Sequence, residues 1–212
     1  MALRCTPLAS CFHAHKLLSL FLIFLSILLG VVRLSAQSTS SATDERVMKL
    51  HDEAKTAEQR GDLNTAIANY ESILRIAPQL AAAYNNLGAL YFKLREYGKA
   101  AEVLKKGLKI NPEMPSASAL LGMSLFERGE YAEARAPFEK ALRSNPKDND
   151  LELFLVNDLT RLGEFEAAAA HLQQLKNREP NNQQVWYLLG NVYTQLAQQA
   201  QTRDAQKLEE PS

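Results

Sequence analysis

The sequence predicts an all-α fold, a solenoid of helix-turn-helix repeats, and three observations support this prediction. Prolines recur at a fixed step of 34 residues, at Pro78, Pro112, Pro146 and Pro180. Small and apolar residues keep the same step in other columns. Within each unit, apolar side chains recur at offsets of three and four residues, the period of an amphipathic helix. Together these observations predict four full units of two helices each and a partial fifth unit.

Two columns contain the smallest residues, and we expect them to mark where the two helices of a unit approach most closely. Glycine lacks a Cβ atom and alanine has no heavy side-chain atom beyond it, so bulk at these positions would push the helices apart. The prolines end the second helices, because the ring removes a donor and restricts the preceding residue. The small columns are Gly88, Gly122 and Gly190, and Ala66, Ala100, Ala134 and Ala168.

The turn between the two helices of a unit carries its own signal. Gly61, Gly129 and Gly163 stand at the end of a first helix, where a left-handed residue caps the last carbonyl groups at little steric cost. Arg95 and Ala197 occupy the same column in the second and fifth units. The turn at Arg95 is therefore expected to be less sharply defined than its neighbours.

This set of columns resembles the tetratricopeptide repeat family. The resemblance runs from about Val47 to Leu196. It implies a right-handed superhelical solenoid in which the first helices line a concave groove. The residues that carry it, beside the small columns and prolines, are Leu87, Leu121, Leu155 and Leu189, the aromatic residues Tyr84, Trp186, Tyr91 and Tyr193 of first helices, and the bulky residues Tyr70, Leu104, Phe138 and Leu172 of second helices.

The repeat boundaries follow from the period. We expect repeats over residues 47–80, 81–114, 115–148 and 149–182, and a partial fifth repeat with a polar capping helix over 183–210. The first repeat matches least well, as expected at an array end. In the second helix of the fifth repeat the small and bulky columns hold Thr202, Gln206 and Glu209. A polar capping helix and an array that has been cut short would both give this pattern, and the sequence leaves both open.

The N-terminus has the three-part order of a secretory signal over residues 1–36, followed by a flexible tether over 37–46. Arg4 and Lys16 precede an apolar run, Leu17–Val32, and small residues follow up to Ala36. The run would span about 24 Å as a helix, less than the ~30 Å hydrocarbon core, which favours cleavage over an uncleaved anchor. Either reading predicts repeats outside the cytoplasm, periplasmic or secreted, or held at the inner membrane in the alternative.

Both cysteines, Cys5 and Cys11, lie in this leader, so the mature chain has no thiol. Leu8–Cys11 spells a lipoprotein attachment box. Such a box has to follow the apolar run, and here it precedes the run. The sequence therefore disfavours a lipid anchor.

Residues suited to catalysis are scarce. The sequence contains no phosphate-binding loop, zinc-protease motif or nucleophile elbow. After the leader only His51 and His171 remain, and His171 is expected to be an ordinary surface histidine of a second helix. Net charge is zero, and it becomes slightly negative without the leader, which gives no electrostatic basis for nucleic-acid binding. We predict a non-catalytic chain with no cofactor, no metal and no nucleic-acid partner, and with membrane contact only through an uncleaved leader.

The family resemblance implies that the partner, a protein or peptide segment, binds along the first helices. Asparagines could grip an extended backbone, and aromatic residues and methionine could accept apolar side chains. Phe92 and Phe126 have a plain alternative, which is to pack between adjacent first helices. The predicted groove residues are Asn85, Ala89, Phe92, Met123, Phe126, Leu153, Asn157, Tyr187 and Asn191.

One subfamily can be tested against the sequence. Co-chaperone arrays of this family clamp a C-terminal carboxylate with asparagine and several cations. Asn86 fits the middle position of that pattern, whereas Ser116 and Leu120 stand where the final cations should be. Without those charges a carboxylate has little to pair with, so a clamp is disfavoured.

Overall fold

The computed structural model describes residues 43–209, and over this range the chain contains helices and no strand. The chain divides into two units, Met1–Asp52 and Glu53–Ser212. The first unit is described only over residues 43–52, which are helical. The predicted leader, with Leu17–Val32, lies outside the described residues.

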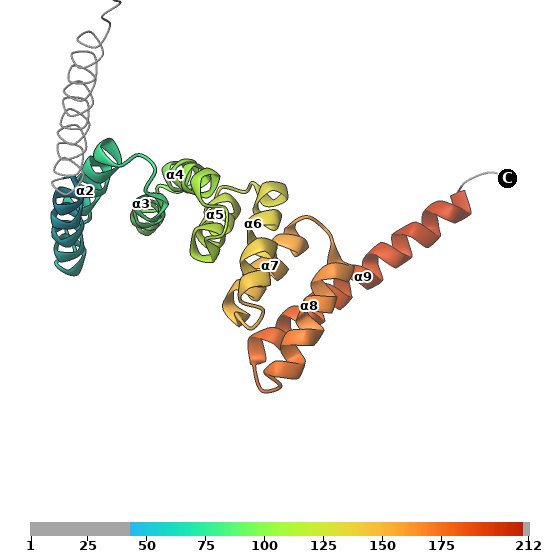
Figure 1. Cartoon of the computed structure of the whole chain (residues 1–212). Helices are drawn as coiled ribbons and strands as arrows, with labels where there is room; N and C mark the ends of the chain where they lie inside the picture. Colours follow the sequence, from blue (N-terminus) through green and yellow to red (C-terminus); the bar gives the residue numbers. More distant parts are fainter. Residues whose placement is uncertain (1–42, 210–212) are drawn as a thin grey trace, which may run out of the picture. The chain divides into compact units, whose positions relative to one another are not determined.

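The second unit is a series of helices in chain order, shown in Figure 1. Residues 53–59 are helical and precede α2. No helix between residues 43 and 209 is both long and apolar enough to cross a membrane. The helices are α2 (Leu63–Ile76), α3 (Ala81–Lys93), α4 (Tyr97–Ile110), α5 (Pro115–Glu127), α6 (Tyr131–Ser144), α7 (Asn149–Arg161), α8 (Phe165–Arg178) and α9 (Gln183–Glu209).

The helices pack in pairs along the chain. α3 packs against α4, α5 against α6, and α7 against α8, and each second helix also packs against the first helix of the next repeat. First helices contact one another as well, α3 with α5 and α5 with α7. The solenoid therefore buries a continuous core, in which every repeat packs on its neighbours.

Gly88 and Gly122 lie at the closest contacts between paired helices, as predicted, whereas a Cβ atom added to Gly190 would meet nothing within 4 Å. A Cβ atom added to Gly88 would lie 2.5 Å from Cγ of Leu104, and one added to Gly122 would lie 2.7 Å from Cδ1 of Phe138. In repeats two and three, the bulky residue of the second helix therefore fills the space left by the glycine of the first. Ala66, Ala100, Ala134 and Ala168 are fully buried.

The turn at Arg95 corrects one expectation. Arg95 has φ +60°, and the amide of Glu96 donates to the carbonyl of Tyr91 at 2.9 Å. The turn at Gly129 has the same bond at the same length, from Glu130 to Leu125. The Arg95 turn is thus as well defined as its glycine counterparts, although a left-handed non-glycine residue costs about 1 kcal/mol.

Residues 183–209 form one continuous 27-residue helix, α9, and not a partial repeat followed by a separate capping helix. Ala197 occupies the column of Arg95 and makes no turn. After Arg95, the strain is offset because Leu104 packs back on the first helix. After Ala197, the corresponding position is the polar Gln206, so nothing offsets the strain and the helix continues.

The predicted tether over 37–46 also needs correction. Its described part, residues 43–46, is helical. This stretch contains Asp44 and Glu45 but neither glycine nor proline, so its composition does not interrupt a helix. Residues 37–42 lie outside the described part of the chain.

Candidate functional site

The first-helix face is the surface on which the sequence places a partner, and most of its predicted residues lie on three helices that touch in order. Asn85, Ala89 and Phe92 lie on α3, Met123 and Phe126 on α5, and Leu153 and Asn157 on α7. All seven are partly exposed. Tyr187 and Asn191 lie on α9, which packs on α8, and both are exposed.

The two phenylalanines of this face pack on neighbouring helices. Phe92 lies with its ring centroid 5.4 Å from that of Tyr97, and Phe126 lies 5.3 Å from Tyr131 and 6.2 Å from Phe154. Phe154 belongs to α7, the adjacent first helix, so Phe126 packs between first helices as the alternative reading held. Both phenylalanines remain partly exposed, so each can also contact a ligand.

The asparagines of this face differ in their partners. Asn85 accepts a hydrogen bond from the hydroxyl of Ser116 at 3.3 Å, which links α3 to α5. Between residues 43 and 209, the side chains of Asn157 and Asn191 have no hydrogen-bond partner. All donors and acceptors of these two amides are therefore free of hydrogen bonds within the described part of the chain.

Asn86, the one residue that fits the carboxylate-clamp pattern, is used inside the fold. Its amide donates to the hydroxyl of Tyr70 at 3.3 Å, and that hydroxyl donates to Glu58 at 3.1 Å. Burial, reinforced by the Glu58 charge, raises the pKa of Tyr70. The hydrogen bonds from Asn86 to Tyr70 and from Tyr70 to Glu58 link repeat two to repeat one. This group contains no cation that could pair with a carboxylate.

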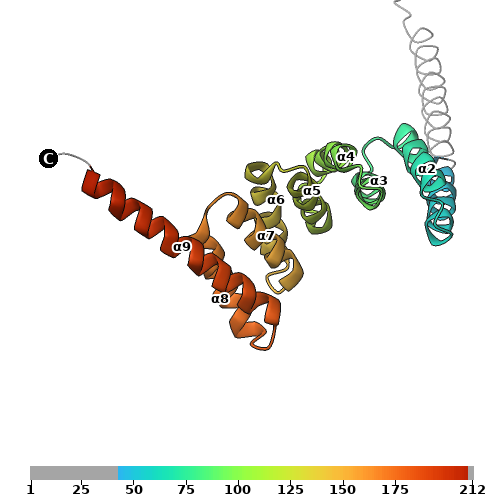
Figure 2. The ribbon, with the colours of Figure 1, turned by 180° about the vertical axis from the view of Figure 1, so that it is seen from behind.

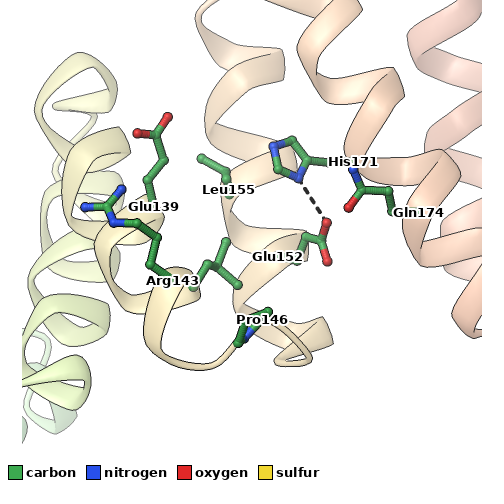
Figure 3. Close-up of a pocket in the computed structure, with 8 residues that line it drawn as sticks. Glu139, Arg143, Pro146, Glu152, Leu155, His171 and Gln174 are labelled. Carbon is green, nitrogen blue, oxygen red and sulfur yellow. Dashed lines mark hydrogen bonds and ion pairs between the residues drawn. The ribbon is translucent and has the colours of Figure 1, made fainter.

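A second candidate site, which the sequence did not predict, lies among α6, α7 and α8. A pocket of about 590 Å³ is open there between the second helices of repeats three and four (Figure 3). Figure 3 shows Glu139 and Arg143 on one side, Glu152 and Leu155 at the middle helix, and His171 with Gln174 on the other side. The lining residues are Glu139, Leu142, Arg143, Pro146, Glu152, Leu155, His171 and Gln174.

Glu152 is the centre of this pocket and is 4 % exposed. Nδ1 of His171 lies 2.9 Å from its carboxylate, and Arg178 pairs with its other oxygen. The expectation that His171 is an ordinary surface histidine is wrong, because the ring is half-buried against this carboxylate. Burial lowers the pKa of His171; nearby Arg135 also lowers it, whereas Glu139 opposes the shift.

Beyond the pocket, a pair of charges acts on the buried carboxylate of Asp158 on α7 without contacting it. Arg135 pairs with Glu139 at 2.9 Å and binds Glu164 through Nη1 at 2.6 and 2.8 Å. Asp158 is fully buried and neither of its carboxylate oxygens has a hydrogen-bond partner. Burial raises the pKa of Asp158 to about 6; the Glu164 charge adds to this and Arg135 opposes it.

The pocket has little capacity for chemistry. Its lining contains no hydroxyl or thiol nucleophile, and Glu152 is already held by His171 and Arg178. No group of three or more His, Cys, Asp and Glu side chains in the described part of the chain could hold a metal ion. The arrangement is that of a buried ion-pair cluster inside repeat four, which Arg178 links to repeat three by donating to the carbonyl of Pro146 at 2.8 Å.

A sequence signal for both buried acids did exist. Glu152 stands in the column of Tyr84 and Trp186, and Asp158 stands in the column of Leu90 and Val192. The other members of these columns are apolar residues, serine or threonine, with Ser118 in the first column and Thr56 and Ser124 in the second. A carboxylate in such a column therefore indicates a buried charge. The sequence does not show which second-helix residues would meet it.

The geometry defines a helical-repeat protein with a ligand-accessible face and no assembled catalytic centre in its described part. Three tetratricopeptide repeat models match residues 59–95, 90–149 and 125–192, and together they extend from residue 59 to residue 192 of the 212. The chain belongs to the tetratricopeptide repeat family. Proteins of this family generally act as non-catalytic interaction modules.

Solved structures of this fold are similar to the chain at low sequence identity. The crystal structure of MamA is 21% identical, covering 77% of this chain and 90% of that chain, with a TM-score of 0.70. YrrB, described as a TPR protein with an unusual peptide-binding site, is 19% identical over 74% of this chain and 81% of that chain, with a TM-score of 0.67. A MamA fragment from Desulfovibrio magneticus RS-1 is 17% identical over 78% and 98%, with a TM-score of 0.66. No curated protein matches the sequence at a significant level.

Proposed function

We propose that this chain is a non-catalytic extracytoplasmic adaptor that holds a segment of a partner protein along its first helices. The fold supports this proposal, since the repeat family serves protein-protein interaction. The observation that carries it is the pair of unpartnered amides, Asn157 and Asn191, on the first-helix face. A face without a ligand has no need of two such groups beside Met123, Phe126 and Tyr187.

The proposed binding mode combines backbone and side-chain recognition. Asparagine donates and accepts at once, so Asn157 and Asn191 can pair with both groups of an extended peptide unit. Met123 adapts its shape, and Phe92 and Phe126 offer the accessible part of packed rings to apolar partner side chains. A partner segment with alternating apolar residues fits this face better than a highly charged one.

A comparison of two double variants tests the proposal. Asn157→Ala with Asn191→Ala should weaken capture of the native partner by about 1–3 kcal/mol per lost buried hydrogen-bonding group, with helicity unchanged. The matched control is Lys105→Ala with Lys109→Ala, on the exposed side of α4, where Lys105 makes only a surface pair with Glu133 at 3.2 Å. Undiminished capture by the asparagine variant, with loss in the lysine variant, would move the site to the second helices.

The location outside the cytoplasm is the second part of this proposal, and it rests on the order of charge, apolar run and small residues up to Ala36. A reporter that is active only outside the cytoplasm, fused after the leader, should be active. A silent reporter would refute export.

The alternative function is an envelope assembly scaffold anchored by an uncleaved Leu17–Val32. Intact mass of the protein isolated from its native envelope separates the two. Loss of the residues through Ala36 supports the free adaptor, and a full-length mass supports the anchored scaffold.

A further inference from the structure

One face of α9 is open where the matching face of α3 is covered. Tyr91 on α3 is 9% exposed, whereas Tyr193, at the same position of the repeat, is 45% exposed. Gly88 would clash with Leu104 of α4 if it carried a Cβ atom, whereas a Cβ atom on Gly190 would meet no atom within 4 Å. The difference is a second helix packed on this face, which repeat two has and which does not follow α9 in the described part of the chain.

The open face is a stripe of four residues, Trp186, Gly190, Tyr193 and Ala197, which we call the α9 stripe. Its members are spaced by four, three and four residues, so they lie along one side of the helix. Ala197 belongs to the stripe because α9 continues through the position where earlier repeats turn. Figures 1 and 2 show that the second half of α9 extends past α8.

The aromatic rings of the α9 stripe are held in place at their polar edges. The indole nitrogen of Trp186 donates to the carbonyl of Pro180 at 2.8 Å, and Nζ of Lys176 lies 5.4 Å from the ring centroid. The hydroxyl of Tyr193 accepts a hydrogen bond from Gln173 at 2.6 Å. Trp186 is nonetheless 51% exposed, so a large part of each fixed ring faces outward.

Size alternates along the α9 stripe as large, small, large, small, and this order is complementary to itself. If a second α9 lies antiparallel with its Tyr193 opposite Gly190, its Ala197 falls opposite Trp186. The two-fold axis repeats both contacts, so all four large residues of the pair face a small one. This is the contact that Leu104 makes with Gly88 and Phe138 with Gly122 inside the array.

We propose that the α9 stripe binds the α9 stripe of a second copy of this chain, antiparallel and two-fold symmetric. The contact continues the array's established helix-helix interface, with the second copy in the place that a second helix occupies in earlier repeats. Two-fold symmetric dimers are the commonest assemblies, and they require a self-complementary surface of this kind. The proposal is independent of partner binding, because Tyr187 and Asn191 lie beside the α9 stripe and not on it.

The α9 stripe covers about 17 Å of helix, so the interface is small and the dimer should dissociate on dilution. Sedimentation velocity of the purified protein should give the mass of two chains at about 100 µM and move toward one chain near 1 µM. Trp186 is the only tryptophan of the sequence, so its fluorescence reports on the contact directly. Its emission should shift to the red over the same dilution.

Gly190→Leu is the decisive variant. Within one chain the added side chain starts in open space, so helicity should be kept. In the dimer it meets Tyr193 of the second copy at two symmetric places, which should raise the dissociation constant by about a hundredfold or more. Gln195→Leu places leucine at an exposed position of α9 outside the α9 stripe, and this variant should dimerise with the dissociation constant of the parent.

A second variant tests the other small position of the α9 stripe. Ala197→Leu removes the other small position, so it should also give single chains at about 100 µM. Parent protein that sediments as one chain at this concentration overturns the proposal. So does a Gly190→Leu variant that sediments as two chains.

Discussion

The Gly122→Leu substitution tests the packing of the repeat core at its tightest aromatic contact. A Cβ atom at position 122 would lie 2.7 Å from Cδ1 and 2.8 Å from Cε1 of Phe138. Phe138 has no room to retreat, because it is fully buried and its ring stacks on Phe154 at 6.2 Å. Leucine adds three more carbons beyond this first clash.

The expected loss of stability is the difference between two effects. Overpacking a buried contact costs about 1–3 kcal/mol, and the upper end applies here because both sides are fixed. Replacing a helical glycine returns up to about 1 kcal/mol. The net loss of about 2 kcal/mol should lower the melting temperature by about 4–8 °C in a domain of this size.

Thermal unfolding followed by circular dichroism measures this loss. Gly190→Leu, melted at a concentration where the chain is a monomer, is the matched control, since its Cβ atom meets nothing within 4 Å. It should melt at the parent temperature or slightly above. Equal melting of Gly122→Leu and the parent, or an equal drop in both variants, would refute the assignment of position 122 to a closed helix contact.

Three further predictions concern buried charge and backbone strain. Burial raises the pKa of Asp158 from 3.8 to about 6 on folding, so the folded chain holds this proton more tightly than the unfolded chain. The fold should therefore lose up to about 3 kcal/mol of stability as the pH increases through this window. Asp158→Asn should therefore melt above the parent at pH 7.5, and a variant that melts lower would contradict the buried, unpaired carboxylate. Burial lowers the pKa of His171, so the unfolded chain binds this proton more readily and the fold should lose stability as the pH falls below about 6.5. In urea titrations, the unfolding free energy of His171→Gln should therefore fall less than that of the parent on acidification to pH 5. Arg95→Gly should raise the unfolding free energy by about 1 kcal/mol in the same titrations, because glycine removes the strain at φ +60°.

The fold was predictable because the same residue pattern recurs in successive repeats. The step of the prolines and the small columns predicted the helix pairs and the contacts at Gly88 and Gly122. The turn at Arg95 and the missing turn at Ala197 were not predictable from the turn residue alone. Whether the chain turns depends on the helix that would follow, where Leu104 packs on the first helix and Gln206 cannot. The strain of the turn is thus weighed against a packing energy at a position nine residues further on.

The candidate sites were predictable to different degrees. The first-helix residues could be placed by phase, since position within the repeat determines the face on which a side chain lies. The pocket around Glu152 could not, because it needs His171 and Arg178, which are 19 and 26 residues further along the chain. Sequence phase locates columns, but the side-chain network between the two helices of a repeat depends on which rotamers meet.

The uninterrupted α9 has a consequence for local dynamics. Beyond Ala197 its backbone is protected by intrahelical hydrogen bonds alone, and an isolated helix of a dozen residues is only marginally stable in water. Amide protons there should exchange through fraying from the C-terminal end, at rates that do not depend on the free energy of global unfolding. Those of Val185–Val192 are anchored on α8 and should exchange only through larger openings. One helix would thus contain two kinetic segments, with the boundary at the column where every earlier repeat turns.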